Sequence, residues 1–509
     1  MNNVAAYSLE LKAKPFEINA GRHIAILHAE TAAKLGLHPL DRIEIFHPQK
    51  KIKTATVIDT TDTVLKKHEI GLFSELTGLL EAKEGQALIV SAAGVPESLN
   101  SIKKKLNGVT LTSEEIKSIV RDINANKLSD IELSAFMTAV HIRGFDLNET
   151  VAMAQALSEN GRRIKFDVSP IVDKHSVGGI NGRATMLVVP IVAAAGLYIP
   201  KTSSRSITSA AGTADAMEVL ANVNLSAEKV KSITEKVGGI IMWGGALDLA
   251  PVDDKIIRVE YPLSQNPQGQ VIASVIAKKA AVGSKFVVID IPIGQGMKIS
   301  DRQQGSAMAE KFISVGRRMG MKVEAVLTDG SQPSGNAFGP ALEARNVMQV
   351  LEGEFFDNLA QKSCELCGVL FELAGKTDAG EGFDFAKKIL KSGKALKKMQ
   401  QIIKAQGKRV DSSKKIEFAP YSTEVRAEKE GEVSRANVKK LIELARIAGA
   451  PYDKRAGVLL NVEPGHSVEK GSPLYTIYAE NKRRLALAEK FALSAKPVEF
   501  EKIILEKIS

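Results

Sequence analysis

The chain comprises 509 residues, carries a formal net charge of +10 and contains two cysteines and one tryptophan. This length corresponds to about three to four domains of ordinary size. Aromatic residues are sparse and no nucleic-acid recognition motif accompanies the positive charge, so no nucleic-acid partner is expected. No segment has an apolar stretch long enough for a signal core or a membrane span. We therefore expect a cytoplasmic protein without membrane contact, and its charge is compatible with phosphorylated substrates.

The first 90 residues are expected to form a β-rich domain. Short runs of β-forming residues alternate there with turns, and they fall at residues 42–46, 54–59 and 87–90. Alternation of this kind, without longer helical spacing, is typical of a small sheet or barrel.

A helical domain is expected over residues 91–170. Two capping boxes, opened by Thr112 and Ser129, each precede an amphipathic segment. The second of these helices is predicted to end at Gly144, and residues 148–160 supply a further helix.

Residues 171–415 are expected to form an α/β domain that binds phosphate and substrate, followed by a small α+β domain over 416–509. Continuous apolar runs alternate with helical segments, which predicts a mostly parallel sheet covered on both faces. Ligands of such sheets bind at the carboxyl ends of the strands. The strand-like runs are residues 187–193, 238–242, 287–291 and 323–327.

The two cysteines, Cys364 and Cys367, form one C-x-x-C pattern inside a segment with helical apolar spacing. A second pair of metal ligands is missing from the sequence, so no metal site is expected. Two small core residues on one helix face explain the pattern better than a redox pair does.

Two clusters of small hydrogen-bond donors and fixed cations indicate a function. Lys174, His175 and Ser176 stand just before a glycine pair, where backbone N–H groups can approach an anion closely. Residues 201–213 surround one cation, Arg205, with serine and threonine hydroxyls ahead of an expected helix. The spacing of a Walker loop is absent. Either cluster alone could be an ordinary turn, but two clusters joined by one apolar segment favour a site for a phosphate-like anion.

These residues resemble those of the thymidine and pyrimidine-nucleoside phosphorylases, most closely the longer branch that includes the archaeal AMP phosphorylases. The resemblance covers nearly the whole chain. Besides both clusters and the amino-terminal extension, it includes Leu128-Ser129-Asp130, Ile142-Arg143-Gly144, residues 272–279 and residues 329–343. It implies a helical domain and a mostly parallel-sheet α/β domain of the nucleoside phosphorylase/phosphoribosyltransferase type. It also implies a homodimer or larger homo-oligomer, and no cofactor, because inorganic phosphate is a co-substrate.

The resemblance further implies a role for individual residues. The positions that would bind inorganic phosphate are Lys174, Ser176, Thr185, Ser203 and Thr213. The positions that would contact the rest of the substrate are Gly178, Ser204, Arg205, Ser206, Ile207, Thr208, Ser209, Ser274 and Lys298. The catalytic positions around the departing base are His175, Lys278, Arg258 and Asn266.

One of these positions departs from the family pattern. Asn266 stands where the nucleotide-cleaving relatives would have an aspartate that gives a proton to the purine. An amide is no general acid, and losing such assistance costs about a hundredfold in rate. A pyrimidine could still depart, and Asp253 or Asp254 could supply an acid by another route. We therefore expect a pentosyltransferase that converts a pyrimidine nucleoside, thymidine first, and phosphate into the base and 2-deoxy-D-ribose 1-phosphate.

Two alternatives stay open at this point. A nucleotide phosphorylase would release ribose 1,5-bisphosphate from nucleoside 5′-monophosphates such as AMP. It would need a second phosphate site, which Arg205, the hydroxyls of residues 204–209 and Lys298 could form. A noncatalytic nucleotide-binding regulator is the other alternative, but it would not require Lys174 and Lys278 together.

Overall fold

The computed structural model describes residues 7–21, 23–178, 182–206, 209–294 and 297–501. The chain divides into two compact units, one of Met1–Gly161 with Ala250–Ser274 and one of Arg162–Leu249 with Val275–Ser509. Helix α11 (Gln268–Ala281) begins in the first unit and ends in the second. Among the residues described, no helix combines the length and the apolar character needed to cross a bilayer.

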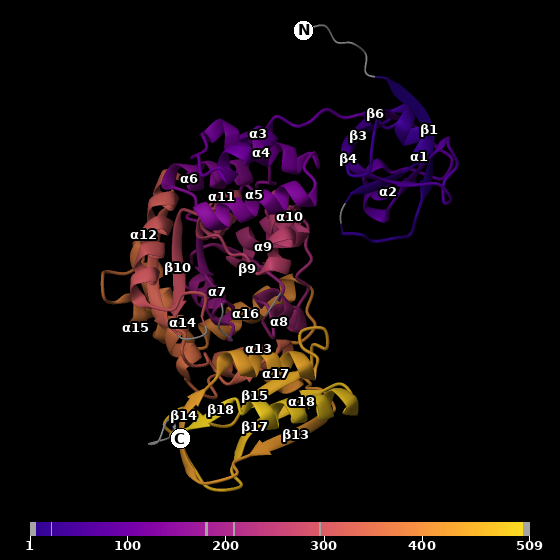
Figure 1. Cartoon of the computed structure of the whole chain (residues 1–509). Helices are drawn as coiled ribbons and strands as arrows, with labels where there is room; N and C mark the ends of the chain where they lie inside the picture. The colour runs from indigo at the N-terminus through magenta and orange to yellow at the C-terminus, as the bar shows by residue number, and fades with distance from the viewer. Residues whose placement is uncertain (1–6, 22, 179–181, 207–208, 295–296, 502–509) are drawn as a thin grey trace, which may run out of the picture. The chain divides into compact units, whose positions relative to one another are not determined.

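Six short strands of the amino-terminal region, drawn in indigo in Figure 1, close into a barrel. β1 (Ser8–Pro15) pairs in parallel with β5 (Glu69–Leu72) and antiparallel with β6 (Ala87–Ala92), which closes the ring. Leu27 and Ile43 are fully buried in its core. The other elements are β2 (Ile24–His28), β3 (Arg42–His47), β4 (Ile52–Thr61), α1 (Ala29–Lys34) and α2 (Ser74–Leu80). The predicted β-rich character is confirmed.

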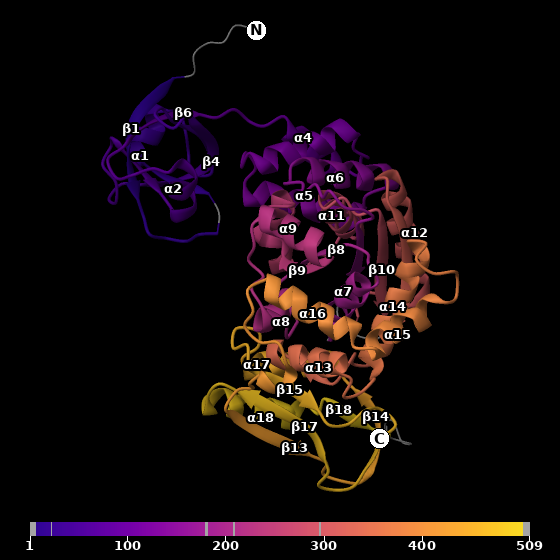
Figure 2. The same cartoon turned by 180° about the vertical axis from the view of Figure 1, so that it is seen from behind.

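Five helices make up most of the rest of the first unit, and they are labelled in purple and magenta tones in Figure 1 or Figure 2. They are α3 (Ser98–Leu106), α4 (Ser113–Asn124), α5 (Asp130–Arg143), α6 (Leu147–Glu159) and α10 (Pro251–Glu260). α4 packs against α6, while α3 and α10 pack against α5. Both predicted capping boxes are present, with Thr112 and Ser129 as the N-caps of α4 and α5. Gly144, with a φ of 71°, ends α5 as predicted.

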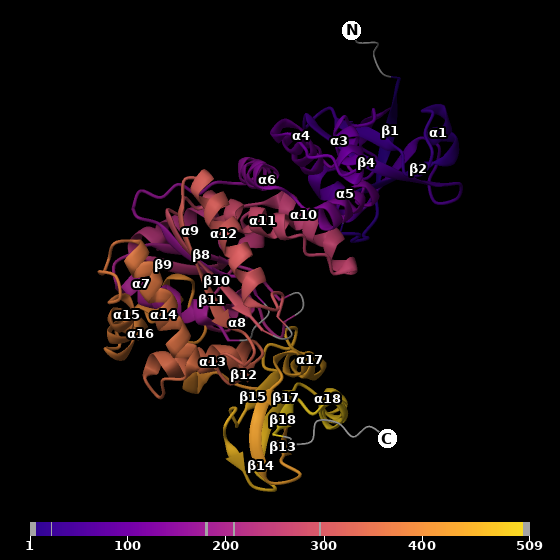
Figure 3. The same ribbon diagram turned by 60° about the vertical axis from the view of Figure 1, so that its left-hand side comes forward.

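A parallel sheet lies at the centre of the second unit and is visible in Figure 3. Its strands are β7 (Val172–Ser176), β8 (Ile199–Ser203), β9 (Gly239–Trp243), β10 (Phe286–Ile293) and β11 (Lys322–Asp329). β10 pairs in parallel with both β7 and β11, and β8 pairs in parallel with β9. A bridge between Ile171 and Tyr198 joins the two groups of strands. The predicted fold class, with a mostly parallel sheet, is confirmed.

Helices pack around this sheet. They are α7 (Ala184–Ala194), α8 (Thr213–Leu220), α9 (Ala227–Val237), α12 (Arg302–Arg318), α13 (Pro340–Glu352), α14 (Asn358–Leu373), α15 (Gly382–Lys391) and α16 (Lys394–Ala405). α7 packs against α14 and α16, and α12 packs against β10 and β11. α15 and α16 turn their apolar faces to the core and carry most of the lysines of this basic stretch on the other side.

The prediction of a strand at residues 187–193 is wrong, because this segment forms the middle of α7. Residues 184–193 are all buried, so the helix shows no polar face and its sequence has no helical period to recognise. Several β-branched residues also favour a strand here. Burial among the helices of the second unit decides the conformation here, against the local preference.

The carboxyl-terminal part of the second unit, in orange and yellow in Figure 1, is a small α+β arrangement. Its elements are β13 (Tyr421–Arg426), β14 (Gly431–Ala436), α17 (Val438–Ala448), β15 (Gly457–Leu460), β16 (Ser467–Val468), β17 (Pro473–Ala479), α18 (Lys482–Ala495) and β18 (Val498–Phe500). β12 (Ala337–Phe338), which precedes α13, pairs with β15 and so extends this sheet. Ala210 and Phe338 belong to its apolar core. The carboxyl-terminal sheet is therefore built partly on the α/β region that carries the candidate site.

Both cysteines lie in the buried face of α14. Burial raises the pKa of the Cys364 thiol to about 12 and raises the pKa of Cys367 well above its ordinary value. Neither is a thiolate near neutral pH, which agrees with two small core residues.

Candidate functional site

The predicted phosphate-binding residues lie at one edge of the parallel sheet, where β7 and β8 end and α7 and α8 begin. Ser176 and Ser203 are the last residues of β7 and β8. Thr185 lies in the first turn of α7, and Thr213 is the first residue of α8. These four elements are in mutual contact through β7 with β8 and α7 with α8. Strand carboxyl ends and helix N-termini together offer an anion site at this edge, while the contact of each residue with a ligand stays a prediction.

Lys174 lies on β7 with its side chain almost fully buried. Its Nζ is 3.3 Å from Asp290 Oδ2 on β10, and Lys362 Nζ is 3.3 Å from the same oxygen. Burial lowers the pKa of Lys174, with Asp290 acting against this and Lys362 adding to it. Burial would raise the pKa of Asp290, but the two ammonium groups hold it below its ordinary value. Two cations facing one carboxylate leave a local excess of positive charge, which suits an anionic ligand.

One hydroxyl at this edge, Ser203 Oγ at the end of β8, is buried and has no hydrogen-bond partner among the described residues. The Ser176 hydroxyl at the end of β7 lies against Asp290, whose pKa it helps to lower. Buried polar atoms are nearly always paired, and leaving one unpaired costs about 1–3 kcal/mol. Ser203 Oγ therefore marks a place where a ligand oxygen would complete the hydrogen bonding.

His175 lies on β7 between Lys174 and Ser176, and it is half-buried. Burial lowers the pKa of His175 well below its ordinary value, and the positive charges of Lys279, Lys201, Lys174 and Lys278 lower it further. The imidazole is therefore neutral at pH 7, so it can form hydrogen bonds but supplies no charge. A role for His175 as a cation beside a departing base does not fit this environment.

The second cluster is folded around Asp215 in the first turn of α8. The Asp215 carboxylate accepts hydrogen bonds from Ser206 N at 2.7 Å and from Gly212 N at 2.8 Å. The Ser206 hydroxyl donates to Ser209 O within the loop. A Cβ at Gly212 would lie 2.5 Å from Ser204 O, so this close approach requires glycine. Hydrogen bonds to Asp215 and within the loop therefore fix Ser206, Ser209 and Gly212.

Arg205 is the cation of the second cluster, and its guanidinium is bound to protein carboxylates. Its Nη1 and Nη2 lie 2.7 and 2.9 Å from the two oxygens of Glu218, and Nη1 lies 3.1 Å from Asp215 Oδ1. The guanidinium also stacks on Trp243, 4.9 Å from the ring centroid. Hydrogen bonds from Arg205 lower the pKa of Glu218 to about 2. These contacts favour a role in holding the loop, and a contact of Arg205 with substrate stays a prediction.

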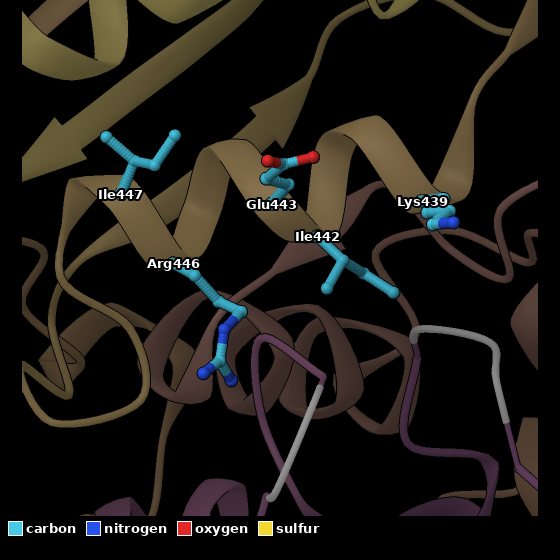
Figure 4. Close-up of a pocket in the computed structure, with 5 residues that line it drawn as sticks. All are labelled: Lys439, Ile442, Glu443, Arg446 and Ile447. Atoms are coloured by element: carbon cyan, nitrogen blue, oxygen red, sulfur yellow. The ribbon is translucent and has the colours of Figure 1, made fainter. Parts of the chain in front are cut away.

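A hollow of about 430 Å³ lies on α17 beside this loop. Its lining residues, shown in Figure 4, are Lys439, Ile442, Glu443, Arg446 and Ile447. Arg446 points away from the axis of α17, and its Nη1 donates to Ser209 O at 3.1 Å. Because Ala210 is also part of the carboxyl-terminal core, this domain supports the second cluster from outside.

Three predicted site residues, Arg258, Asn266 and Ser274, belong to the first unit. Ser274 Oγ donates to Asp253 Oδ2 at 2.7 Å, and this aspartate is 1% exposed. Asp253 therefore orients the Ser274 hydroxyl. Arg258 and Asn266 are both exposed, and Arg258 Nη2 donates to Asp130 Oδ1 at 2.7 Å. The roles of all three stay predictions.

The remaining predicted residues lie in the second unit. Gly178 adopts a φ of 95°, the left-handed conformation that glycine allows. Lys298 lies at the surface, and Lys278 is half-buried in the last turn of α11. Ile207 and Thr208 lie outside the described residues.

Several charged residues that hold this site together were missed in the sequence. Asp290 stands inside an otherwise apolar strand, and a buried acid in such a run is a signal that could have been used. Glu343 is 1% exposed and accepts hydrogen bonds from Gly182 N at 3.0 Å and Gly339 N at 3.1 Å, besides pairing with Arg183. This pair fixes the residues just before α7.

Replacing Glu343 with glutamine should destabilise the protein by about 3–5 kcal/mol, because Arg183 would keep a buried charge without its carboxylate. The measurement is the free energy of unfolding from urea titration. Glu354→Gln is the matched control, since Glu354 lies just beyond the end of α13 and is exposed; its effect should stay within about 0.5 kcal/mol. Equal effects of the two variants would contradict a structural role of the Arg183–Glu343 pair.

Comparisons with known proteins agree with this architecture. Residues 100–161 match the helical bundle domain of a glycosyl transferase family, residues 168–396 match its a/b domain, and residues 433–496 match the pyrimidine nucleoside phosphorylase C-terminal domain. The AMP phosphorylase of Methanococcus aeolicus is 42% identical over 507 residues, covering 98% of this chain and 99% of that protein. The AMP phosphorylase of Thermococcus kodakarensis is 43% identical over 505 residues, with the same coverage.

One solved structure shows the likeness of the fold alone. Anthranilate phosphoribosyltransferase from Thermus thermophilus has a TM-score of 0.53 and 21% identity. The match covers 60% of this chain and 99% of that chain.

The matching family domains and the relatives define an enzyme of the pentosyltransferase class. Its substrates are a nucleoside or nucleotide and phosphate. The chain belongs to the pyrimidine-nucleoside phosphorylase family, in the longer branch that includes the AMP phosphorylases. The expected family is therefore confirmed.

The expectation that thymidine is the substrate is wrong. Relatives that are similar over nearly the full length of the chain are AMP phosphorylases, which favours the nucleotide alternative. Asn266 bears on how the base departs, and it carries no information about whether the site also holds a 5′-phosphate.

Proposed function

We propose that the chain catalyses the reversible phosphorolysis of nucleoside 5′-monophosphates, with AMP as the first substrate to test. The products would be the free base and ribose 1,5-bisphosphate. The observation that carries the proposal is the 42% and 43% identity to AMP phosphorylases over 98% of the chain. A loop rich in hydroxyls beside a separate phosphate-binding edge supports it, because a nucleotide substrate and inorganic phosphate need two anion sites.

Inorganic phosphate would attack C1′ of the ribose, and no protein nucleophile is required. The protein has to orient the attacking oxygen and stabilise the charge that moves onto the base. Lys174 would provide the fixed charge for inorganic phosphate. The hydroxyls of Ser176, Thr185, Ser203 and Thr213 would provide its hydrogen bonds. The unpaired Ser203 hydroxyl supports this assignment.

The loop of residues 204–209 would hold the nucleotide, with Gly178, Thr213, Ser274 and Lys298 as further contacts. Asp215 accepts a hydrogen bond from Ser206 N, and Arg205 is paired with Glu218, so these two residues of the loop are held in place before a ligand binds. Lys278 and Arg258 would stabilise the negative charge of the departing base, while His175 would contribute hydrogen bonds as a neutral imidazole.

The experiment is product analysis for AMP, adenosine and thymidine at saturating phosphate. AMP should be cleaved with a kcat/KM at least about tenfold above that for adenosine, because each charge-assisted hydrogen bond to the 5′-phosphate contributes about 1.5–3 kcal/mol. Chromatography should identify adenine and ribose 1,5-bisphosphate. Equal cleavage of AMP and adenosine, or release of base from neither, would contradict the proposal.

The assembly and the compartment are part of the same proposal. The family resemblance supports a homodimer or larger homo-oligomer, which sedimentation of the purified chain would test. Because nucleoside monophosphates and inorganic phosphate are metabolites of the cytoplasm, we place the reaction there, and nucleotide salvage would be its use.

A further inference from the structure

A buried carboxylate next to the predicted phosphate site is shared by two lysines from different elements. Asp173 on β7 is fully buried, and its Oδ2 lies 2.8 Å from Lys279 Nζ on α11. Its Oδ1 lies 3.5 Å from Lys201 Nζ on β8. Lys279 and Lys201 are themselves 1% and 4% exposed. The proposed reaction gives none of these three groups a role in binding or catalysis.

These three groups would not balance in charge if both lysines were protonated. Two ammonium groups and one carboxylate would leave one buried positive charge in excess, and burying an uncompensated charge costs several kcal/mol. The other charged groups around Lys201 do not correct this, since Lys174 on the neighbouring strand adds a further cation. His175 and Lys278 also lie close to this group, the first neutral and the second a lysine.

The surroundings of Lys201 fit a lysine that is neutral until an anion binds. Burial lowers the pKa of Lys201 to about 7; Asp173 opposes this, while the positive charges of Lys279 and Lys174 add to it. Its Nζ donates to Thr202 O at 2.7 Å, which a neutral amine can also do. The neutral amine therefore becomes the main form of Lys201 as the pH rises above 7.

Lys201 and Asp173 lie next to residues that are predicted to bind phosphate. Lys201 precedes Ser203 by two residues on β8, so the two side chains leave the strand on the same face. Asp173 directly precedes Lys174, whose N–H donates to Asp173 Oδ1 at 2.7 Å. The buried, unpartnered Ser203 hydroxyl and the Lys174 ammonium are both predicted phosphate contacts. A dianion at this edge would supply the negative charge that a second ammonium group needs.

We propose that Lys201 and Lys279, joined through Asp173, are positioning residues of the phosphate site and that Lys201 gains a proton when a dianion binds. The proposal rests on the proposed function for the location of the anion. It adds a proton to the binding step, so the affinity for a dianion falls as the pH rises from 7 to 9. The proton is taken from solvent and stays on the lysine while the anion is bound.

Calorimetry of sulfate binding to the full chain tests this proposal. Sulfate is fully ionised over this pH range, so any proton taken up goes to the protein, whereas inorganic phosphate changes its own protonation. Titration at pH 8 in buffers of different ionisation enthalpy should show uptake of more than about half a proton per sulfate bound. No proton uptake on binding, or no binding of sulfate or phosphate at this pH, would overturn the proposal.

Two single variants test whether the proton uptake depends on the three residues Lys201, Lys279 and Asp173. Lys201→Met and Lys279→Met should each reduce the uptake to near zero, because each leaves one ammonium group for one carboxylate. Lys398→Met is the matched control: Lys398 is a partly buried lysine of α16 whose pKa burial also lowers, and its Nζ donates to Val237 O. This variant should keep the uptake of the unmodified protein. Undiminished uptake in both Lys201→Met and Lys279→Met would overturn the assignment.

The thermal unfolding transition of each variant shows whether it is folded, and the measurement on the unmodified protein needs no variant.

Failure of this proposal can be told apart from failure of the proposed function. If AMP is cleaved and sulfate binds without proton uptake, only the role of the lysine pair is wrong. If sulfate binds with proton uptake and AMP is not cleaved, the lysine pair stands and the nucleotide substrate is wrong.

Discussion

Lys174→Met is expected to lower kcat/KM for phosphorolysis by about a thousandfold. Lys174 would supply the fixed positive charge that holds inorganic phosphate, and removing one such preorganised contact costs about 10²–10³ in rate. Its ammonium is buried, so no solvent-exposed cation can replace it at the same point. Initial rates with AMP over a range of phosphate concentrations would measure both kcat and the KM for phosphate.

Lys362→Met is the matched control for that substitution. Lys174 and Lys362 each lie 3.3 Å from Asp290 Oδ2, so either substitution leaves Asp290 with one lysine and changes the buried charge equally. Only Lys174 is predicted to contact phosphate. Lys362→Met should therefore lower kcat/KM by about tenfold or less. Equal losses in the two variants would mean that Lys174 acts through the charge balance at Asp290 and not through the ligand.

The positions of the helix starts and of the anion clusters were predictable, because both depend on local chemistry. Thr112 and Ser129 each bring the glutamate of a capping box three residues later, and the structure uses both as N-caps. The clusters on β7 and before α8 could be recognised since hydroxyls, glycine and lysine gather there within a few residues. Local patterns of this kind need no knowledge of the rest of the fold.

The pairing of charges across the sheet was not predictable in the same way. Lys174 meets Asp290 and Lys362, which lie more than a hundred residues further along the chain, and only the parallel register of β7 with β10 brings them together. Arg205 looked like a free cation beside serines, yet its partner Glu218 is supplied by α8. The helix at residues 187–193 was missed because complete burial removes the period that distinguishes helix from strand.

The substrate could not be predicted from one residue near the departing base. Asn266 alone favours a pyrimidine nucleoside, although the 5′ end of the substrate would be recognised by the loop of residues 204–209 and Lys298. Similarity over the full length of the chain favours a nucleotide instead. The absence of a general acid at Asn266 then affects only the reaction rate and which base is preferred among nucleotides.

Asn266→Asp should therefore raise kcat for AMP by about a hundredfold, because a carboxyl group could give a proton to the purine as it departs. Asn266 lies at the protein surface just before α11, so the aspartate adds no buried charge and the fold should be unaffected. A general acid acts in its protonated form, so the gain should be largest at low pH and decline as the pH rises above the pKa of the new carboxyl group.

The comparison of AMP with UMP makes this result specific. A pyrimidine leaves as an anion stabilised by its carbonyl groups, so the same substitution should change the rate with UMP by less than about threefold. Asn266→Ala removes the amide without adding an acid, and it should leave the rates with both nucleotides near those of the unmodified chain. A gain with UMP equal to that with AMP would point to a change in binding. No gain with AMP would show that a different group, for which buried Asp253 beside Ser274 is the first to examine, already gives the proton.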